Sequence, residues 1–264
     1  DLVGAGGGSG IGVIRYESAT NLATGGTITT DGDFKVHTFT SSGTFTPTAN
    51  NVAPGTSSIA FDGTGDELTV PSTVGNFGSG DFTLECWVRG TSTADGIIMG
   101  QIQSGGTDEV FIRRNSSTTY IRVRLLTDAA DYNMTGTAPT SSDTWYHIAA
   151  TRDGDTLRSY VGGVQDTSLS ISGSVADPTS VFGIGSGGDY TSDHFVGYID
   201  EVRLSDTCRY PDGTTFTPST TQFTADSNTL LLIHSDWDGG LGADSSGNYN
   251  TFTPTNLVAT DKMV

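Results

Sequence analysis

The sequence has few of the residues on which several classes of protein depend. Cysteine occurs only at Cys86 and Cys208 among 264 residues, so a framework of several disulfides does not hold this chain together. Lysine and arginine together number 12 against 30 aspartates and glutamates, which gives a formal net charge of −18. Because nucleic acids bind proteins through clustered cations, this balance argues against a nucleic-acid partner.

Long apolar runs and helical patterns are also missing. The chain has no run of 18 apolar residues, so the sequence predicts no membrane insertion. No long segment repeats apolar residues with the spacing i, i+3, i+4, i+7, so we expect little helix. For the cysteines we expect buried free thiols, although a single bridge between Cys86 and Cys208 stays open if their strands are neighbours.

What the chain does contain is short alternating runs separated by glycine-rich turns. Residues 145–161 hold two strand-like runs around Asp153 and Gly154, a pair that supplies the positive φ angles of a tight β-hairpin turn. Residues 82–89 and 195–204 also alternate with a period of two. Runs of this kind, separated by Gly, Asp and Ser, are typical of an antiparallel β-sandwich.

Four of these segments, in this order, resemble the laminin-G-like or concanavalin A-like jelly roll. They are FDGTGDELTVP (61–71), DFTLECWVR (81–89), WYHIAATRDGDTLRSYVGG (145–163) and GYIDEVRLSD (197–206). The resemblance covers about residues 57–206. It implies an all-β fold, an antiparallel jelly-roll β-sandwich over residues 52–235, with a small β appendage before it and an irregular C-terminal tail after it.

The N-terminal part has a resemblance of its own. GVIRY and ATGGTITTDGDFKVHTFTSSGTFT, within residues 10–46, are similar to the segment that closes glycine-rich domains in bacteriophage tail-fibre and related virion proteins. Half of residues 1–12 are glycine, and this segment has too few side chains to form a packed core alone. We therefore expect residues 1–50 to form a glycine-rich β-hairpin appendage, either packed on the sandwich or independent of it.

The C-terminal part begins with the most apolar run of the chain, TLLLIHSDW at residues 229–237. We expect this strand to fold back onto the sandwich, while opening a following module or completing the sheet of a neighbouring subunit are alternatives. Residues 236–264 are then a C-terminal tail or the start of a following module. Within them, TPTNL at 253–257 resembles a module of marine phage structural proteins.

The sequence offers no recognisable catalytic constellation. Glycosidases among concanavalin A-like relatives carry closely spaced acids on one strand, whereas Glu85 and Glu201 are single carboxylates in alternating strands. No Gly-x-Ser-x-Gly elbow occurs at a strand-to-helix turn, and the four histidines are scattered without a zinc-binding spacing. We therefore predict that the protein is not an enzyme.

Calcium is the one cofactor that the sequence favours, as a structural ion. Ca²⁺ takes six to eight oxygen ligands, which loops rich in Asp and Gly provide. The resemblance implies a site where the loop of the first strand meets the last strand, at Asp62, the carbonyl of Gly63 and Asp200, and a second set at Asp189 and Asp193. The alternative is that Asp62 and Asp200 cap turns and accept backbone hydrogen bonds.

Carbohydrate recognition uses exposed aromatic side chains beside polar loops. Four aromatic residues have loop-like surroundings and are candidates for this role: Tyr132, Tyr190, Tyr210 and Trp237. Trp87 and Trp145 lie in predicted strands, so we expect them in the core.

Together these features predict a structural and recognition protein on the surface of a virion, as a tail-fibre, appendage or capsid-surface component of a marine-type phage. Its jelly roll would bind a host surface glycan or other virion subunits, and we expect a homo-oligomer. The alternative is a subunit of a cellular extracellular filament or adhesin, joined by exchange of terminal strands. The chain begins at Asp1 rather than methionine, so we expect it to be part of a longer product.

Overall fold

The computed structural model describes residues 10–17, 23–32, 34–44, 46–47, 57–91, 95–103, 109–115, 120–138, 140–175, 179–190, 192–235, 243–258 and 261–263. Within these ranges no helix is long and apolar enough to cross a membrane. The chain divides into two compact units, residues 1–52 and residues 53–264.

The first unit is a small antiparallel sheet. Its strand order is β1 (Gly12–Glu17), β4 (Phe34–Phe39) and β3 (Thr27–Asp31), and β2 (Ala23–Thr24) pairs separately with β5 (Thr46–Pro47). Gly26 has a φ of +66°, and a Cβ there would lie 2.7 Å from the carbonyl oxygen of Thr38. This turn therefore requires glycine. Among the described side chains of the unit, no hydrophobic one is buried.

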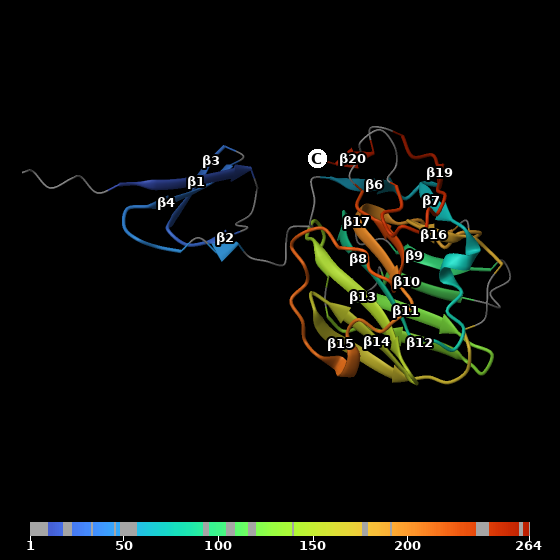
Figure 1. The fold of residues 1–264 in the computed structure, drawn as a ribbon. Helices are drawn as coiled ribbons and strands as arrows, with labels where there is room; N and C mark the ends of the chain where they lie inside the picture. Colours follow the sequence, from blue (N-terminus) through green and yellow to red (C-terminus); the bar gives the residue numbers. More distant parts are fainter. Residues whose placement is uncertain are drawn as a thin grey trace, which may run out of the picture. The chain divides into compact units, whose positions relative to one another are not determined.

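The second unit is a sandwich of two antiparallel sheets (Figure 1). Sheet I has the order β15 (Val164–Ser170), β14 (Thr156–Val161), β13 (Tyr146–Asp153), β8 (Phe82–Gly90), β17 (Val196–Ser205), β6 (Ser58–Asp62) and β20 (Lys262–Met263), with β18 (Thr229–Ile233) beside β17. Sheet II has the order β12 (Asp131–Thr135), β11 (Tyr120–Leu126), β10 (Glu109–Asn115), β9 (Gly96–Ile102), β16 (Phe182–Ile184), β7 (Glu67–Val70) and β19 (Thr253–Thr255). Apart from two 3₁₀ turns, η1 (Ser72–Gly75) and η2 (Pro211–Gly213), the described residues contain no helix.

Alternation along the strands explains where the core lies. Leu84, Cys86 and Val88 of β8 point between the sheets and pack with Val110 and Ile112 of β10. A strand places every second side chain on the same face, so a period of two in the sequence becomes one buried and one outward face. The all-β jelly-roll sandwich predicted from the sequence is confirmed.

The predicted central hairpin is also present. Strands β13 and β14 pair up to Asp153 and Thr156, and Gly154 between them has a φ of +57°. Both cysteines are free, with Cys86 buried and Cys208 half-buried. Burial raises the pKa of the Cys86 thiol well above its ordinary value, as an apolar environment does for any group whose charged form must lose water.

The C-terminal strand folds back as expected, because Leu231 of β18 pairs with Leu204 of β17. The tail then continues into both sheets. Pro254 of β19 pairs with Leu68 at the edge of sheet II, and β20 pairs with β6 at the edge of sheet I. The sandwich therefore extends past the limit expected at residue 235, since an open strand edge presents unpaired N–H and C=O groups that another strand can satisfy.

Candidate functional site

The two outward faces of the sandwich differ in what lies on them. The outer face of sheet I is covered by residues 206–228, which we call the arm. Phe216 of the arm donates its N–H to the carbonyl of Gly163, and Phe223 donates its N–H to the side chain of Glu201. Phe223 also packs against Trp87 on that face. The arm thus shields this face from solvent.

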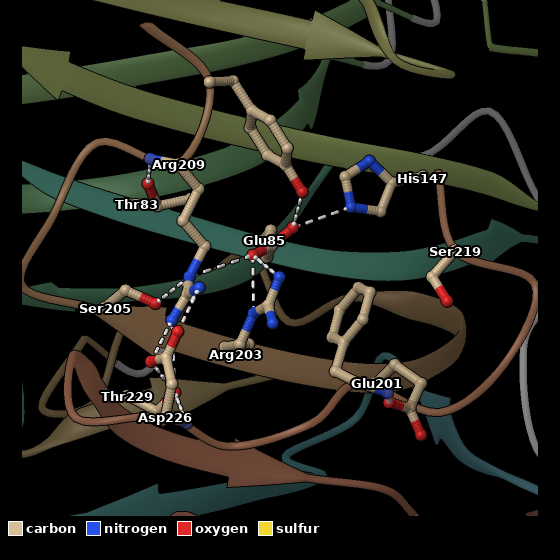
Figure 2. Close-up of polar contacts among 12 residues, drawn as sticks. Thr83, Glu85, His147, Glu201, Arg203, Ser205, Arg209, Ser219, Asp226 and Thr229 are labelled. Atoms are coloured by element: carbon tan, nitrogen blue, oxygen red, sulfur yellow. Dashed lines mark hydrogen bonds and ion pairs between the residues drawn. The ribbon is translucent and has the colours of Figure 1, made fainter. Parts of the chain in front are cut away.

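Glu85 of β8 is the centre of the polar contacts beneath the arm (Figure 2). Its side chain is fully buried. One carboxylate oxygen accepts a hydrogen bond from Arg203 Nε at 2.7 Å. The other lies 3.0 Å from His147 Nε2 and accepts a 2.6 Å hydrogen bond from the Tyr210 hydroxyl. Strand β17, strand β13 and the arm therefore each place one side chain against this carboxylate.

These contacts decide the ionisation of Glu85. Burial alone would raise its pKa, but the hydrogen bond and charge of His147, with Arg203 and Tyr210, lower the pKa to about 2. Burial and the neighbouring Glu85 charge raise the pKa of Tyr210. A carboxylate that stays charged while buried and multiply hydrogen-bonded acts as a framework group.

The arm is closed by an ion pair between its own ends. Arg209 Nη1 and Nη2 donate to the two carboxylate oxygens of Asp226 at 3.0 Å and 2.8 Å. Arg209 Nε also donates to Ser205 of β17 at 2.6 Å. The hydrogen bonds from Arg209 are the main cause that lowers the pKa of Asp226. The bidentate geometry fixes both distance and orientation.

A second buried carboxylate anchors the arm farther along β17. Glu201 is fully buried and adopts a φ of +50° where the pairing of β17 with β8 shifts register. Its carboxylate accepts the Phe223 N–H at 2.7 Å and lies 2.8 Å from His234 Nδ1. Both single glutamates noted in the sequence thus serve as framework groups beneath the arm.

The outer face of sheet II holds a pocket of about 230 Å³. It is lined by Ile97, Ile102, Glu109, Phe111, Arg113, Arg124 and Tyr190. Val110 and Ile112 of β10 belong to the core, so the alternate residues of that strand point outward into the pocket.

The floor of this pocket is apolar and its rim is aromatic. Ile97, Ile102 and Phe111 form a small buried cluster. Tyr190, in the loop after β16, stands at the rim with 38% of its surface exposed. The pocket thus joins an apolar base to an accessible ring.

The walls of the pocket are ion pairs. Arg124 lies between two carboxylates, with Nη1 2.6 Å from Glu109 and Nη2 2.8 Å from Asp131. Arg113 likewise lies between Asp95, at 3.0 Å, and Asp193, at 3.3 Å. The Arg124 hydrogen bond lowers the pKa of Asp131, whereas burial raises that of Glu109. Each arginine is therefore held rigidly by two acids.

A family model for the concanavalin A-like lectin/glucanases superfamily, of the laminin G type, matches residues 62–213 of the chain. The chain belongs to this superfamily. The fold agrees with a solved structure of a predicted carbohydrate-binding protein from Bacteroides ovatus, at a TM-score of 0.55 and 19% identity over 95% of this chain and 71% of that one.

Two further solved structures are similar to this laminin G-type chain at lower scores. A heptameric SAP-like pentraxin from Limulus polyphemus has a TM-score of 0.45 and 11% identity, over 77% of this chain and 97% of that one. The CBM40 of the Ruminococcus gnavus IT-sialidase, bound to α2,3-sialyllactose, has a TM-score of 0.44 and 16% identity, over 57% of this chain and 90% of that one. Comparison with curated protein sequences finds no match.

The structure of this laminin G-type domain does not bring Asp62 and Asp200 together. Asp62 pairs with Val196, four residues before Asp200 along β17. The Asp62 carboxylate accepts the N–H of Thr64 at 2.6 Å, as in the turn-capping alternative. Asp200 is buried and accepts the N–H of Glu201.

A group that sequence reasoning missed lies beside Asp62 and the following Gly63. Asp62, Asp66 and Asp261 line a pocket of about 240 Å³, and burial and the charges of the other two raise the pKa of Asp66. Among the described residues, no group of three or more His, Cys, Asp or Glu side chains is placed to hold a metal ion. Calcium binding by this superfamily member stays a prediction.

The other predicted residues have separate positions. Tyr190 lines the sheet II pocket, Asp193 forms an ion pair with the lining residue Arg113, and Asp189 is exposed beside Tyr190. The Tyr132 hydroxyl accepts the N–H of Ser172 at 2.9 Å. Tyr210 lies in the arm, stacked on Phe216 with ring centroids 3.6 Å apart. Trp237 lies outside the described residues.

Sequence reasoning overlooked the arginines of the pocket. The signal was present, because Arg113, Arg122 and Arg124 alternate with apolar residues in two consecutive runs. That pattern predicts one buried and one solvent-facing side. It does not show which carboxylates pair with the arginines, because these acids lie as far apart in the sequence as Asp95 and Asp193.

Proposed function

We propose that this member of the superfamily is a carbohydrate-binding protein that holds a glycan in the pocket on sheet II. The observation that carries the proposal is the combination of Tyr190 at the rim, an apolar floor at Phe111, and the charged side chains of Arg113 and Arg124 around them. A sugar ring offers apolar C–H groups to an aromatic face and hydroxyls to polar side chains, so these groups suit it.

Two further observations support this proposal. On sheet I the arm covers the surface around Trp87 and Glu201, whereas the sheet II pocket has an exposed aromatic ring, Tyr190, at its rim. The superfamily includes lectins by its own description, and the similar Bacteroides ovatus protein is predicted to bind carbohydrate.

The proposal is tested by screening the full chain on a glycan array and measuring the affinity of the best ligand by calorimetry. Tyr190→Ala removes the exposed ring, and we expect about a tenfold loss of affinity, in line with a key aromatic contact. The matched control is Tyr249→Ala, because Tyr249 is 88% exposed and outside the pocket. Equal affinities of all three proteins would contradict a site at Tyr190.

We propose, in addition, that the first unit attaches the chain to other subunits. Ile11 and Val13 are 67% and 59% exposed, and Val13 lies in β1, an outer strand of its sheet. Exposed apolar side chains on an outer strand favour pairing with another chain. Residues 1–52 contain two cations and four acids, so this unit carries little of the charge that makes copies of the chain repel one another.

This second role fits the predicted homo-oligomer on a virion surface that binds a host glycan. Analytical ultracentrifugation of the full chain is expected to show an oligomer that Val13→Lys dissociates, whereas Val164→Lys, at a 55% exposed residue of β15, leaves it intact. Immunogold labelling then separates the two settings: label on phage particles supports the virion, and label on cell filaments supports the extracellular alternative.

We propose display of the glycan rather than its cleavage. Glu109, which lines the pocket, and its neighbours Asp131 and Asp193 each form an ion pair with an arginine. A glycosidase needs one carboxyl that donates a proton and a second that acts as base or nucleophile. Incubation with the bound polysaccharide is expected to release no reducing ends, and release that Glu109→Gln abolishes would contradict the proposal.

A further inference from the structure

The arginines of the sheet II pocket are already engaged by carboxylates. Arg124 Nε and Nη2 donate to the two oxygens of Asp131 at 3.1 Å and 2.8 Å, and Nη1 lies 2.6 Å from Glu109. Each of its three guanidinium nitrogens thus contacts an acid of the protein. Recognition of a carboxylate, sulfate or phosphate by arginine uses the same planar fork of donors. Arg124 therefore already binds two carboxylates before an anionic ligand arrives.

The second arginine of the pocket is engaged in a similar way. One nitrogen of Arg113, Nη2, contacts both Asp95 and Asp193. Next to the pocket, Arg122 Nη2 donates to the amide oxygen of Asn133 at 2.7 Å. The charges of Arg113 and Arg124 are therefore matched by carboxylates before any ligand arrives, whereas Arg122 bonds to a neutral amide.

The balance of charge on this face is negative. Its three arginines are accompanied by four carboxylates, namely Asp95, Glu109, Asp131 and Asp193. Asp189 adds a further acid beside Tyr190, and the whole chain has a formal charge of −18. An anionic ligand would meet repulsion both locally and on approach.

From this arrangement we infer that the pocket takes uncharged glycans and rejects those that carry carboxylate, sulfate or phosphate groups. This inference rests on the proposed function and adds the class of ligand. Sugar hydroxyls donate hydrogen bonds to Glu109, the carboxylate that lines the pocket, without disturbing the arginines. An anionic sugar would have to displace a carboxylate from Arg113 or Arg124. Rejection then follows from a repulsive element built into the site.

The first experiment uses a glycan array that presents neutral oligosaccharides and their sialylated, uronate-containing or sulfated counterparts. We expect the full chain to bind a neutral member and to bind its anionic counterpart at least tenfold more weakly. The difference is expected to shrink as salt rises from 0.05 M to 0.5 M, because salt screens repulsion between charges near the surface.

The second experiment removes the charge of one carboxylate partner of Arg124. Asp131→Asn removes the charge that engages two nitrogens of Arg124, and we expect about a tenfold gain in affinity for the anionic counterpart. Affinity for the neutral glycan is expected to change less than threefold. The matched control is Asp153→Asn, which removes one charge from the Arg158–Asp153 pair, 2.8 Å long, on sheet I. It is expected to change neither affinity.

The outcomes separate the two proposals. If the wild-type chain prefers anionic glycans and Tyr190→Ala abolishes that binding, the proposed function stands and the inference about charge is wrong. An equal gain in Asp131→Asn and Asp153→Asn also overturns it, because only the net charge of the chain would then matter. If no glycan binds, or if Tyr190→Ala changes nothing, both proposals fail.

Discussion

The two outer faces of the sandwich use the same chemistry for different purposes. On sheet I, Glu85 meets Arg203 and His147 beneath the arm and is fully buried. On sheet II, Asp131 meets Arg124 at a similar distance but remains 38% exposed. Water screens an exposed ion pair and competes with it, whereas a buried pair has no alternative partner. The difference teaches that exclusion of water by the arm, rather than the residue types, makes one face structural and leaves the other available to a ligand.

The largest expected effect comes from breaking the buried side of this comparison. Glu85→Gln keeps the side-chain volume but leaves Arg203 beside a neutral group, so we expect the free energy of unfolding to fall by about 3 to 5 kcal/mol. Urea denaturation followed by tryptophan fluorescence measures the change. A loss no greater than that of Asp131→Asn would show that the arm contributes nothing to the strength of the pair.

The second-largest expected effect is a loss of stability in acid, as Glu85 beneath the arm becomes protonated. The pKa of Glu85 is about 2 in the folded chain and 4.5 in the unfolded chain. The stability that the charged Glu85 contributes is therefore fully present above pH 4.5. That effect is lost as the pH falls from 4.5 through 2, by roughly 3 kcal/mol in all. Unfolding free energies of the wild type and Glu85→Gln between pH 2 and pH 6 test this. The two curves are expected to converge toward low pH, and parallel curves would refute the assignment.

A single hydrogen bond between arm and sheet gives a smaller effect. Tyr210→Phe removes the hydroxyl that donates to Glu85 at 2.6 Å but keeps the ring stacked on Phe216. Hydrogen bonds to charged groups contribute about 1.5 to 3 kcal/mol, and we expect a loss of that size in thermal or urea unfolding. Tyr249→Phe, at an exposed tyrosine, is the control and should unfold like the wild type.

The smallest expected effect is on the open face. Asp131→Asn removes one partner of a solvent-exposed ion pair, so we expect a loss of stability of about 0 to 1 kcal/mol. The same urea titration measures it. A loss comparable to that of Glu85→Gln would mean that the pocket walls are structural, and it would end the distinction between the two faces.

Much of the fold was predictable because it depends on local patterns. The alternation in residues 82–89 and the turn at Asp153 and Gly154 identified strands and a hairpin that the structure contains. The position of the tail was not predictable, since the pairing of Pro254 with Leu68 joins residues that are far apart in the chain. Nothing in the local sequence of a short edge strand specifies its partner.

The candidate site was predictable only in part. Tyr190 and Asp193 were named from their loop; Tyr190 lines the pocket, and Asp193 forms an ion pair with the lining residue Arg113. Tyr210 had equally loop-like surroundings, yet its hydroxyl bonds to Glu85 beneath the arm. An aromatic residue in a loop looks the same in sequence whether the loop faces solvent or folds over a sheet.

The amino-acid sequence by itself determined the all-β class, the order of the main strands and the lack of clustered cations, because periodicity, turn residues and charge are properties of neighbouring positions. Tertiary structure alone decided that residues 206–228 cover sheet I and leave sheet II open. It also decided that Arg124 meets both Glu109 and Asp131. The physical reason is that burial and ion pairing depend on which distant segments pack together, and only the closed sandwich sets those distances.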